Sequence, residues 1–168
     1  MNIETVAHDG ARMTYGYDPQ HSAALVAYYD GLVESGEIAG YTVITNALGV
    51  SIRSVFLECR QWRDKTAGET YTSAALAING RGVAYFALQW GNLEVMEDTA
   101  GLYLERVGIL DGPSDLRHLS RRIRALGADY YTAKEWRLKR ECYLSGEQLT
   151  PEELRAELSA DYFRRVAL

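Results

Sequence analysis

Residues 70–90, TYTSAALAINGRGVAYFALQW, are the stretch of sequence that decides the fold. Two runs of apolar, β-branched and aromatic residues, 70–78 and 83–90, flank the turn sequence NGRG. Asparagine and glycine accept the positive φ angles of a tight turn, so this stretch predicts a β-hairpin. Both faces of the two runs are largely apolar. We therefore expect the hairpin to lie at the centre of a sheet that is covered on both sides.

Strands and helices are expected on either side of this hairpin. The signals are turn dipeptides such as Asp9-Gly10, apolar residues at helical spacing, and prolines at the first turn of a helix. The clearest helix start is Thr150-Pro151-Glu152-Glu153, which has the pattern of a capping box. The expected elements are strands over 3–8, 11–17, 41–45, 102–109 and 136–144, and helices over 18–36, 51–67, 114–126 and 150–166.

Two of these segments keep a second interpretation. In 51–67, apolar residues recur at helical spacing from Ile52 to Trp62, which favours a helix, although the Val-Phe-Leu centre also suits a strand. In 136–144, apolar and charged residues alternate, which favours a strand. Arg140 interrupts the apolar side of that alternation, so a helix stays open there.

Together these elements predict an α+β protein, with one domain over residues 1–168 and a mainly antiparallel sheet on which about four helices pack. The composition agrees, because 47% of the 168 residues are apolar, 24% are charged and only three are proline. A chain of this length buries a core without needing disulfides or a metal.

The expected location is the cytoplasm, with no membrane association. The N-terminus has neither the basic head nor the apolar run of a secretory leader. The longest stretch without a charge, 38–52, is shorter than the roughly 20 apolar residues of a membrane-spanning helix. Cys59 and Cys142 form no CxxC pair, which favours a reducing compartment.

The formal net charge of −5 is unevenly distributed along the chain. Residues 1–50 hold six acids and a single base, Arg12. Residues 117–140 hold eight bases and only two acids. Such asymmetry indicates a charged partner.

The acidic front of the chain is the leading candidate for a binding surface. The chain has twelve tyrosines and only three phenylalanines. Tyrosine is favoured where one end of the side chain is buried and the other is wet, as at protein interfaces. Carboxylates lie among the tyrosines in this part of the sequence. The predicted protein-binding residues are Tyr28, Tyr29, Asp30, Glu34, Glu37 and Tyr41.

The basic segment over 117–140 is the alternative surface, and its partner would be nucleic acid. Arginines at helical spacing match phosphate oxygens, and neighbouring aromatic rings stack on bases. No recognisable nucleic-acid-binding motif accompanies the charge. The predicted nucleic-acid-binding residues are Arg117, Arg121, Arg122, Arg124, Tyr130, Tyr131, Arg137 and Lys139.

The sequence contains little that is typical of a catalytic site. His8, His21 and His118 are scattered, without the spacing of a metal site, and no nucleophile or phosphate-binding motif is present. We therefore predict no catalytic residue, no metal and no cofactor, and an enzyme whose site only the fold assembles is the third alternative. The leading hypothesis is a non-enzymatic protein that binds to a surface of another macromolecule and so occupies it. The expected partner is a protein, whose identity the sequence does not indicate. Inhibitors and adaptors act in this way, as do immunity-type or anti-defence proteins of mobile elements.

Overall fold

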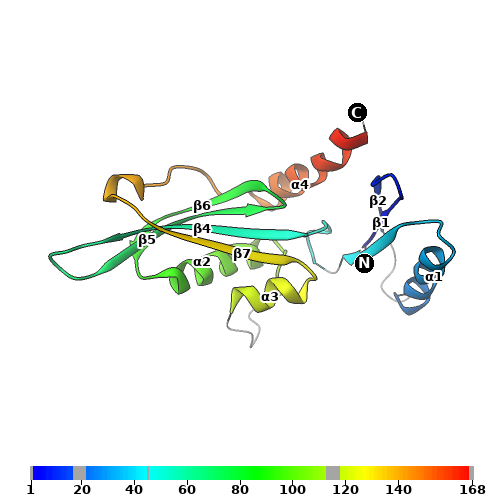
Figure 1. Cartoon of the computed structure of the whole chain (residues 1–168), viewed down its shortest axis with the longest axis horizontal. Coiled ribbons are helices and arrows are strands. Elements are labelled where there is room, and N and C mark those ends of the chain that lie inside the picture. Colours follow the sequence, from blue (N-terminus) through cyan, green and yellow to red (C-terminus); the bar gives the residue numbers. More distant parts are fainter. Residues whose placement is uncertain (1, 17–21, 45, 113–117, 167–168) are drawn as a thin grey trace. The chain divides into compact units, whose positions relative to one another are not determined.

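The computed structural model of the chain contains α-helices and two β-sheets in which most neighbouring strands are antiparallel (Figure 1). The predicted α+β class is therefore confirmed, with two sheets in place of the expected one. The structure describes the backbone of residues 2–16, 22–44, 46–112 and 118–166, and the side chains of these residues except 14, 22 and 160–166.

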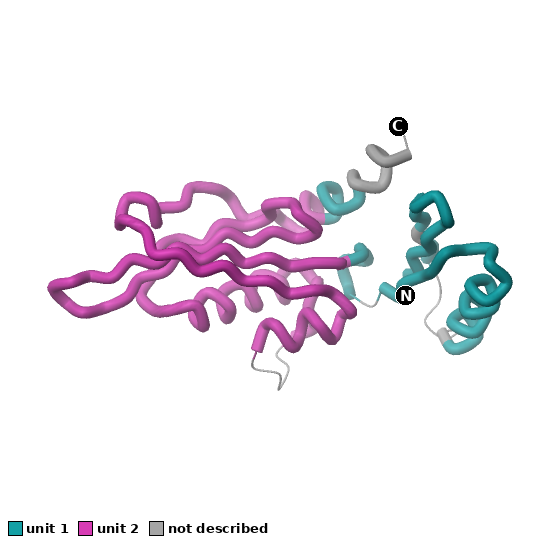
Figure 2. Tube along the Cα trace, in the orientation of Figure 1, with its two compact units in different colours: residues 1–51, 155–168 teal, residues 52–154 magenta. Residues whose placement is uncertain are grey.

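Contacts between residues divide the chain into two compact units (Figure 2). The first unit comprises residues 1–51 and 155–168, and the second comprises residues 52–154. A single domain over 1–168 stays a prediction.

The first unit has a three-stranded antiparallel sheet in the order β2-β1-β3 and a helix. Its elements are β1 (Asn2–Val6), β2 (Arg12–Gly16), α1 (Ser22–Glu34) and β3 (Gly40–Ile44). The predicted N-terminal hairpin is confirmed, because Gly10 takes a φ of +83° in its turn and the Asp9 carboxylate accepts a 2.9 Å hydrogen bond from the Ala11 N–H. The predicted start of the following helix, at Asp18-Pro19, lies outside the described residues.

The second unit has a four-stranded sheet in the order β6-β5-β4-β7, with only β4 and β7 parallel. Helix α2 packs on β4, β5 and β6, and α3 packs on β7, so both helices cover the same face of the sheet (Figure 1). The elements are β4 (Ser54–Arg63), β5 (Thr70–Ile78), β6 (Arg81–Trp90), α2 (Leu93–Arg106), α3 (Leu119–Ala125), β7 (Asp129–Trp136) and the 3-10 helix η2 (Lys139–Glu141).

The hairpin of residues 70–90 is confirmed. Its turn consists of Asn79 and Gly80, whose φ angles of +51° and +80° match the twist of the strands that they join. The expected central position holds for β5 and is wrong for β6, which lies at the edge of the sheet.

The predicted helix over 51–67 is wrong, because β4 occupies this segment. Val55, Leu57 and Cys59 are all fully buried, which is the two-residue period of a strand. Phe56 and Trp62 lie on the opposite face of the same strand. Because apolar residues lie on both faces of β4, the sequence does not show the alternation of apolar and polar residues that is typical of a strand. The same residues also happen to recur at helical spacing.

The predicted strand over 102–109 is also wrong, because most of it belongs to α2. Asn92 caps this helix by accepting a 3.0 Å hydrogen bond from the Glu94 N–H. Met96, Ala100 and Leu104 are fully buried at a spacing of four residues. The apolar stripe therefore begins before the segment in which the strand was expected.

The predicted strand over 136–144 is wrong as well. Strand β7 ends at Trp136, and the chain turns into η2 because the Glu141 carboxylate accepts a 3.0 Å hydrogen bond from the Leu138 N–H. Helix α3 confirms the later part of the helix expected over 114–126, whose residues 114–117 lie outside the described ranges.

Helix α4 (Pro151–Val166) confirms the predicted C-terminal helix. Its capping box is present, since the Thr150 N–H donates to the Glu153 carboxylate at 2.9 Å and the Glu153 N–H donates to the Thr150 hydroxyl at 3.3 Å. The Thr150 hydroxyl also donates to the Glu153 carboxylate at 3.0 Å, and the two hydrogen bonds that this carboxylate accepts lower the pKa of Glu153. None of the helices in the described part of the chain combines the length and the apolar character needed to cross a membrane.

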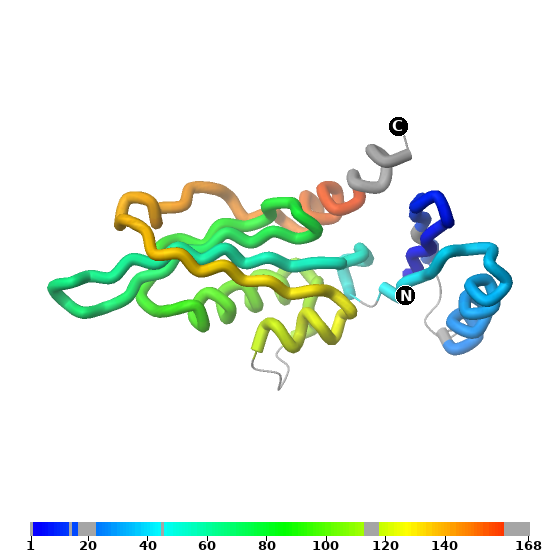
Figure 3. The backbone as a smooth tube through the Cα atoms, viewed as in Figure 1, coloured from blue at the N-terminus to red at the C-terminus, as the bar shows by residue number. Residues whose placement is uncertain are grey.

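A segment of residues 137–150 crosses the face of the four-stranded sheet that α2 and α3 leave open (Figure 3). Near one end, the Arg60 guanidinium donates to the Glu141 carbonyl oxygen at 3.3 Å. Near the other, the Leu149 N–H donates to the Val83 carbonyl oxygen at 3.0 Å. We call residues 137–150 the crossing segment.

Ser73 offers a test of packing inside the four-stranded sheet. Its hydroxyl is buried and has no hydrogen-bond partner among the described residues. We expect Ser73→Ala to raise the free energy of unfolding by about 1 kcal/mol, because an unsatisfied buried hydroxyl is removed. Urea denaturation measures this change.

Thr72→Val is the matched control for Ser73→Ala. The Thr72 hydroxyl donates to the Gly91 carbonyl oxygen at 2.7 Å and accepts from the Gln61 amide at 3.1 Å. Its removal is expected to lower stability. A loss of stability in both variants would show that the Ser73 hydroxyl has a partner after all.

Candidate functional site

Four of the six predicted protein-binding residues form one connected cluster in the first unit. The Tyr41 hydroxyl, from β3, donates to the Asp30 carboxylate on α1 at 2.7 Å. The Tyr29 ring lies 5.5 Å from the Tyr41 ring and 5.3 Å from the Tyr28 ring, measured between centroids. The hydrogen bond to Asp30 is the main cause that raises the pKa of Tyr41, followed by burial and the Asp30 charge.

These residues differ in what they present to solvent. Tyr29 is only 4% exposed, so it packs inside the unit, whereas Tyr28 is 59% exposed. The helical spacing of Leu25, Tyr28, Tyr29 and Leu32 predicts that these four residues share one apolar face, but Tyr28 points outward. Glu34 and Glu37 are exposed, and Glu37 accepts a 3.0 Å hydrogen bond from the Ser35 hydroxyl.

The outward side of α1 is unusually apolar for an exposed helix surface. Its only charged residues are Asp30 and Glu34, and the remaining ones are small or apolar. The exposed residues, which we call the α1 face, are Ala23, Ala24, Ala27, Tyr28, Asp30, Gly31, Val33 and Glu34.

The carboxylates around the α1 face have no lysine or arginine close to them in the sequence. The sequence has no lysine or arginine between Arg12 and Arg53. Arg12 itself forms an ion pair of 2.6 Å with Glu4. Among the residues that the structure describes, Asp30, Glu34 and Glu37 form no ion pair. This part of the first unit therefore presents uncompensated negative charge.

Sequence reasoning missed the alanines of the α1 face and two exposed residues of strand β2. Met13 is 49% exposed and Tyr15 is 38% exposed. The register β2-β1-β3 places both on the same side of the sheet as Tyr41, because Met13 and Tyr41 both pair with Thr5. The run SAALVA in α1 was the available signal, since a helix that ordinarily faces water carries more polar residues.

The basic segment does not form a continuous surface. The Arg122 guanidinium forms an ion pair of 2.6 Å with Glu105 and donates to the Asp111 carbonyl oxygen at 2.7 Å. The Tyr130 hydroxyl donates to the Glu97 carboxylate at 2.8 Å, on the helix-covered side of the sheet. Both side chains are therefore engaged by the protein itself.

The other residues of that segment lie at opposite ends of β7. Arg121 and Arg124 are exposed on α3, before the strand, and Tyr131 is 55% exposed near its beginning. Arg137 and Lys139 follow its end, about 26 Å away for a strand of eight residues. Arg137 forms an ion pair with Glu135. Arg117 lies outside the described residues.

The histidines and cysteines that the structure describes form no recognisable catalytic constellation. His8 bonds the Gly36 carbonyl oxygen at 2.9 Å, and His118 is exposed at the start of α3, while His21 lies outside the described residues. Cys59 and Cys142 are free and fully buried. Burial is the main cause that raises the pKa of the Cys59 thiol, to about 12.

Metal-ligating residues do not gather in the described ranges either, since these contain no group of three His, Cys, Asp or Glu side chains that could hold a metal ion. Compared with known proteins, the chain matches no protein-family model, no curated protein and no solved structure.

Proposed function

We propose that the chain is a non-enzymatic binding protein, an inhibitor or adaptor, whose α1 face occupies a basic surface of a partner protein. The observation that supports this function is the exposed apolar centre of α1 beside carboxylates that have no ion-pair partner among the described residues. The free thiols of the two cysteines suit a cytoplasmic setting. Immunity-type and anti-defence proteins of mobile elements are the proposed biological class.

The composition of the α1 face resembles that of protein interfaces. Such interfaces have an apolar centre, enriched in tyrosine, and a polar rim. Here Ala24, Ala27 and Gly31 allow a partner to approach the helix closely, and Tyr28 offers a large ring that is 59% exposed. Tyrosines in this position are frequent binding hot spots. Tyr28 is therefore the proposed anchor of the interface.

The carboxylates determine the charge of the proposed partner. Asp30, Glu34 and Glu37 are exposed at and just beyond α1. Charges at the rim of an interface act mainly on the rate of association and on the choice of partner. A second copy of the chain would bring two acidic helices together, which the same charges disfavour. A basic protein surface is the complementary occupant.

The test is an affinity capture from a nuclease-treated lysate of the native host, with the wild-type chain and two triple variants. We expect Asp30→Lys, Glu34→Lys and Glu37→Lys together to weaken capture of the partner by about tenfold or more, through slower association. The matched control reverses three exposed acids elsewhere, Asp98, Glu147 and Glu152, with the same change in net charge.

Two outcomes distinguish the proposal from its rivals. The triple variant of Asp30, Glu34 and Glu37 is called the α1-face variant here. A protein that the wild type and the control variant capture equally, and that the α1-face variant no longer captures, supports the proposal. Retention of every captured protein by the α1-face variant at wild-type levels would overturn it. Tyr28→Ala tests the proposed anchor without changing charge, and quantitative mass spectrometry of the captured proteins measures all arms.

A further inference from the structure

All three tryptophans of the chain lie at one end of the four-stranded sheet. Trp62 is near the end of β4, Trp90 ends β6 and Trp136 ends β7. The register places Trp62 opposite Tyr71 and Tyr71 opposite Trp90, so three aromatic residues form a row across three neighbouring strands. Trp136 pairs with Gln61, immediately beside this row.

The row of Trp62, Tyr71 and Trp90 faces the side of the sheet opposite to α2. Its neighbours in the strands point the other way, since the Gln89 amide donates to the Thr99 hydroxyl on α2 at 3.0 Å. The rings of Trp62 and Tyr71 lie 5.5 Å apart. Trp90 is 65% exposed. The row is therefore open to solvent at its Trp90 end.

Positive charge surrounds the aromatic row. Residues 60–71 and 134–141 hold seven bases and four acids. The Lys139 ammonium lies 4.6 Å above the Trp62 ring. The exposed cations of these two stretches that form no ion pair among the described residues are Arg63, Lys65, Lys134, Lys139 and Arg140.

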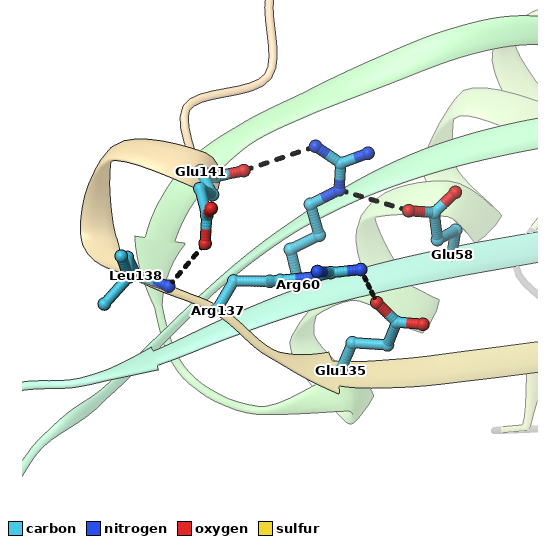
Figure 4. A network of polar contacts seen from close by, with 6 residues as sticks. All are labelled: Glu58, Arg60, Glu135, Arg137, Leu138 and Glu141. Carbon is cyan, nitrogen blue, oxygen red and sulfur yellow. Dashed lines mark hydrogen bonds and ion pairs between the residues drawn. The ribbon is translucent and has the colours of Figure 1, made fainter.

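The carboxylates of the same region already accept hydrogen bonds from nearby groups or form an ion pair. Figure 4 shows Glu135 bonded to Arg137, and Glu141 bonded to the Leu138 N–H. The Asp64 carboxylate accepts from the Thr66 N–H at 2.8 Å in the turn between β4 and β5. Glu69 accepts from the Tyr71 hydroxyl at 3.1 Å. The local excess of bases is therefore available to an anionic ligand.

We infer that this end of the sheet, the tryptophan platform of Trp62, Tyr71, Trp90 and Lys139, binds single-stranded nucleic acid. Unpaired bases stack on Trp90 and Tyr71, while phosphates contact the nearby free cations. Stacking on an aromatic side chain stabilises the bound strand and tolerates every base, because each base has a π-face. Bases in a duplex are already stacked on each other, so duplexes are expected to bind more weakly.

This inference is independent of the function proposed for the α1 face. The platform lies in the second unit, whereas the α1 face lies in the first. The platform shares Lys139 with the basic segment predicted from the sequence, but it does not use Arg121 and Arg124 of helix α3. Separate variants therefore test the α1 face, the tryptophan platform and the exposed arginines of α3.

Intrinsic fluorescence provides a direct measurement, since all of the tryptophan emission comes from this end of the sheet. We expect an oligothymidylate of about 15 nucleotides to quench the emission saturably, with a slope of log affinity against log salt of about −2 to −3 for three or four displaced cations. An oligouridylate of the same length is expected to behave alike, and the corresponding duplex to bind at least tenfold more weakly.

Two variants of the platform and one control define the site. Trp90→Ala is expected to weaken binding about tenfold, and its exposed position preserves the fold. Lys139→Gln is expected to weaken binding and to reduce the salt slope by about 0.7. The control, Arg121→Gln with Arg124→Gln, removes two exposed cations from α3 and is expected to leave binding unchanged.

The platform would be refuted by the absence of saturable quenching at about 50 mM salt, a concentration at which phosphate contacts are strong. Equal weakening in the α3 control and in Trp90→Ala would also refute it, because binding would then follow net charge. Fluorescence anisotropy of a labelled oligonucleotide repeats the measurement for variants that have lost a tryptophan.

Discussion

Gly146→Val is expected to lower the free energy of unfolding by about 3 kcal/mol, through overpacking between the crossing segment and the sheet. A Cβ atom at position 146 would meet three carbons of the Tyr85 ring, with Cγ at 2.7 Å. Because Cγ is attached close to the backbone of β6, the ring cannot avoid this contact by a small rotation. Either Tyr85 leaves its position or the crossing segment lifts.

Lifting the crossing segment has a cost of its own. Its hydrogen bonds to Arg60 and Val83 hold it near both ends, and Cys142, between them, is fully buried. Separation from the sheet would expose the Cys142 thiol to water. We therefore expect Gly146→Val to make Cys142 reactive toward a thiol reagent under native conditions, whereas both thiols of the wild type react only on unfolding.

Gly112→Val is the matched control for Gly146→Val, because a Cβ atom at position 112 meets no atom of the described residues within 4 Å. Neither glycine has a positive φ angle, so neither substitution strains the backbone. A second variant, Tyr85→Ala combined with Gly146→Val, is expected to recover part of the lost stability. Equal losses in Gly112→Val and Gly146→Val would mean that no tight contact exists at Tyr85.

The elements that the sequence predicts well are those determined by local chemistry. The turn at Asn79-Gly80 and the capping box at Thr150 depend on residues within four positions of each other. The predictions of a helix over 51–67 and of a strand over 102–109 are wrong, because contacts with residues far away in the sequence determine that these segments form β4 and part of α2. The apolar residues on both faces of β4 make sense only when β5, β7 and the crossing segment are in place.

The same distinction applies to the candidate surfaces. Tyr29, Asp30 and Tyr41 are close in sequence, and the structure brings them into contact. The row of Trp62, Tyr71 and Trp90 depends on the register of three strands, and a helix over 51–67 would have separated its members. Exposure of individual tyrosines also requires the fold, because helical spacing alone gave Tyr28 and Tyr29 the same face.

Raising the pH from about 9 to about 11 is expected to lower the free energy of unfolding by several kcal/mol, at about 1.4 kcal/mol per pH unit for each ionising group. Two buried side chains and a half-buried one cause this dependence. Burial raises the pKa of Cys59 and of Tyr103 to about 12 each. Burial, together with the hydrogen bond to Glu97, also raises the pKa of Tyr130.

The sign follows from the protons bound in each state. In the unfolded chain, the thiol ionises at its ordinary pKa of 9.0 and the phenols at 10.0. The folded protein holds these protons to higher pH, so above pH 9 the unfolded state binds fewer protons than the folded state. The stabilisation is complete below the unfolded pKa values and is lost progressively as the pH rises toward 12.

Urea denaturation at a series of pH values between about 7 and 11 measures this loss, and two variants assign it to residues. Cys59→Ala is less stable at neutral pH because it leaves a small cavity, but above pH 9 its stability should fall less steeply, by about 1.4 kcal/mol per unit. Tyr103→Phe should show the same reduction in slope only above pH 10, because the phenol ionises later than the thiol. An unchanged slope in both variants, or a level free energy of unfolding up to pH 11, would contradict the burial of these protons. Because the two groups begin to ionise one pH unit apart in the unfolded chain, the order in which the slopes diverge identifies each residue separately.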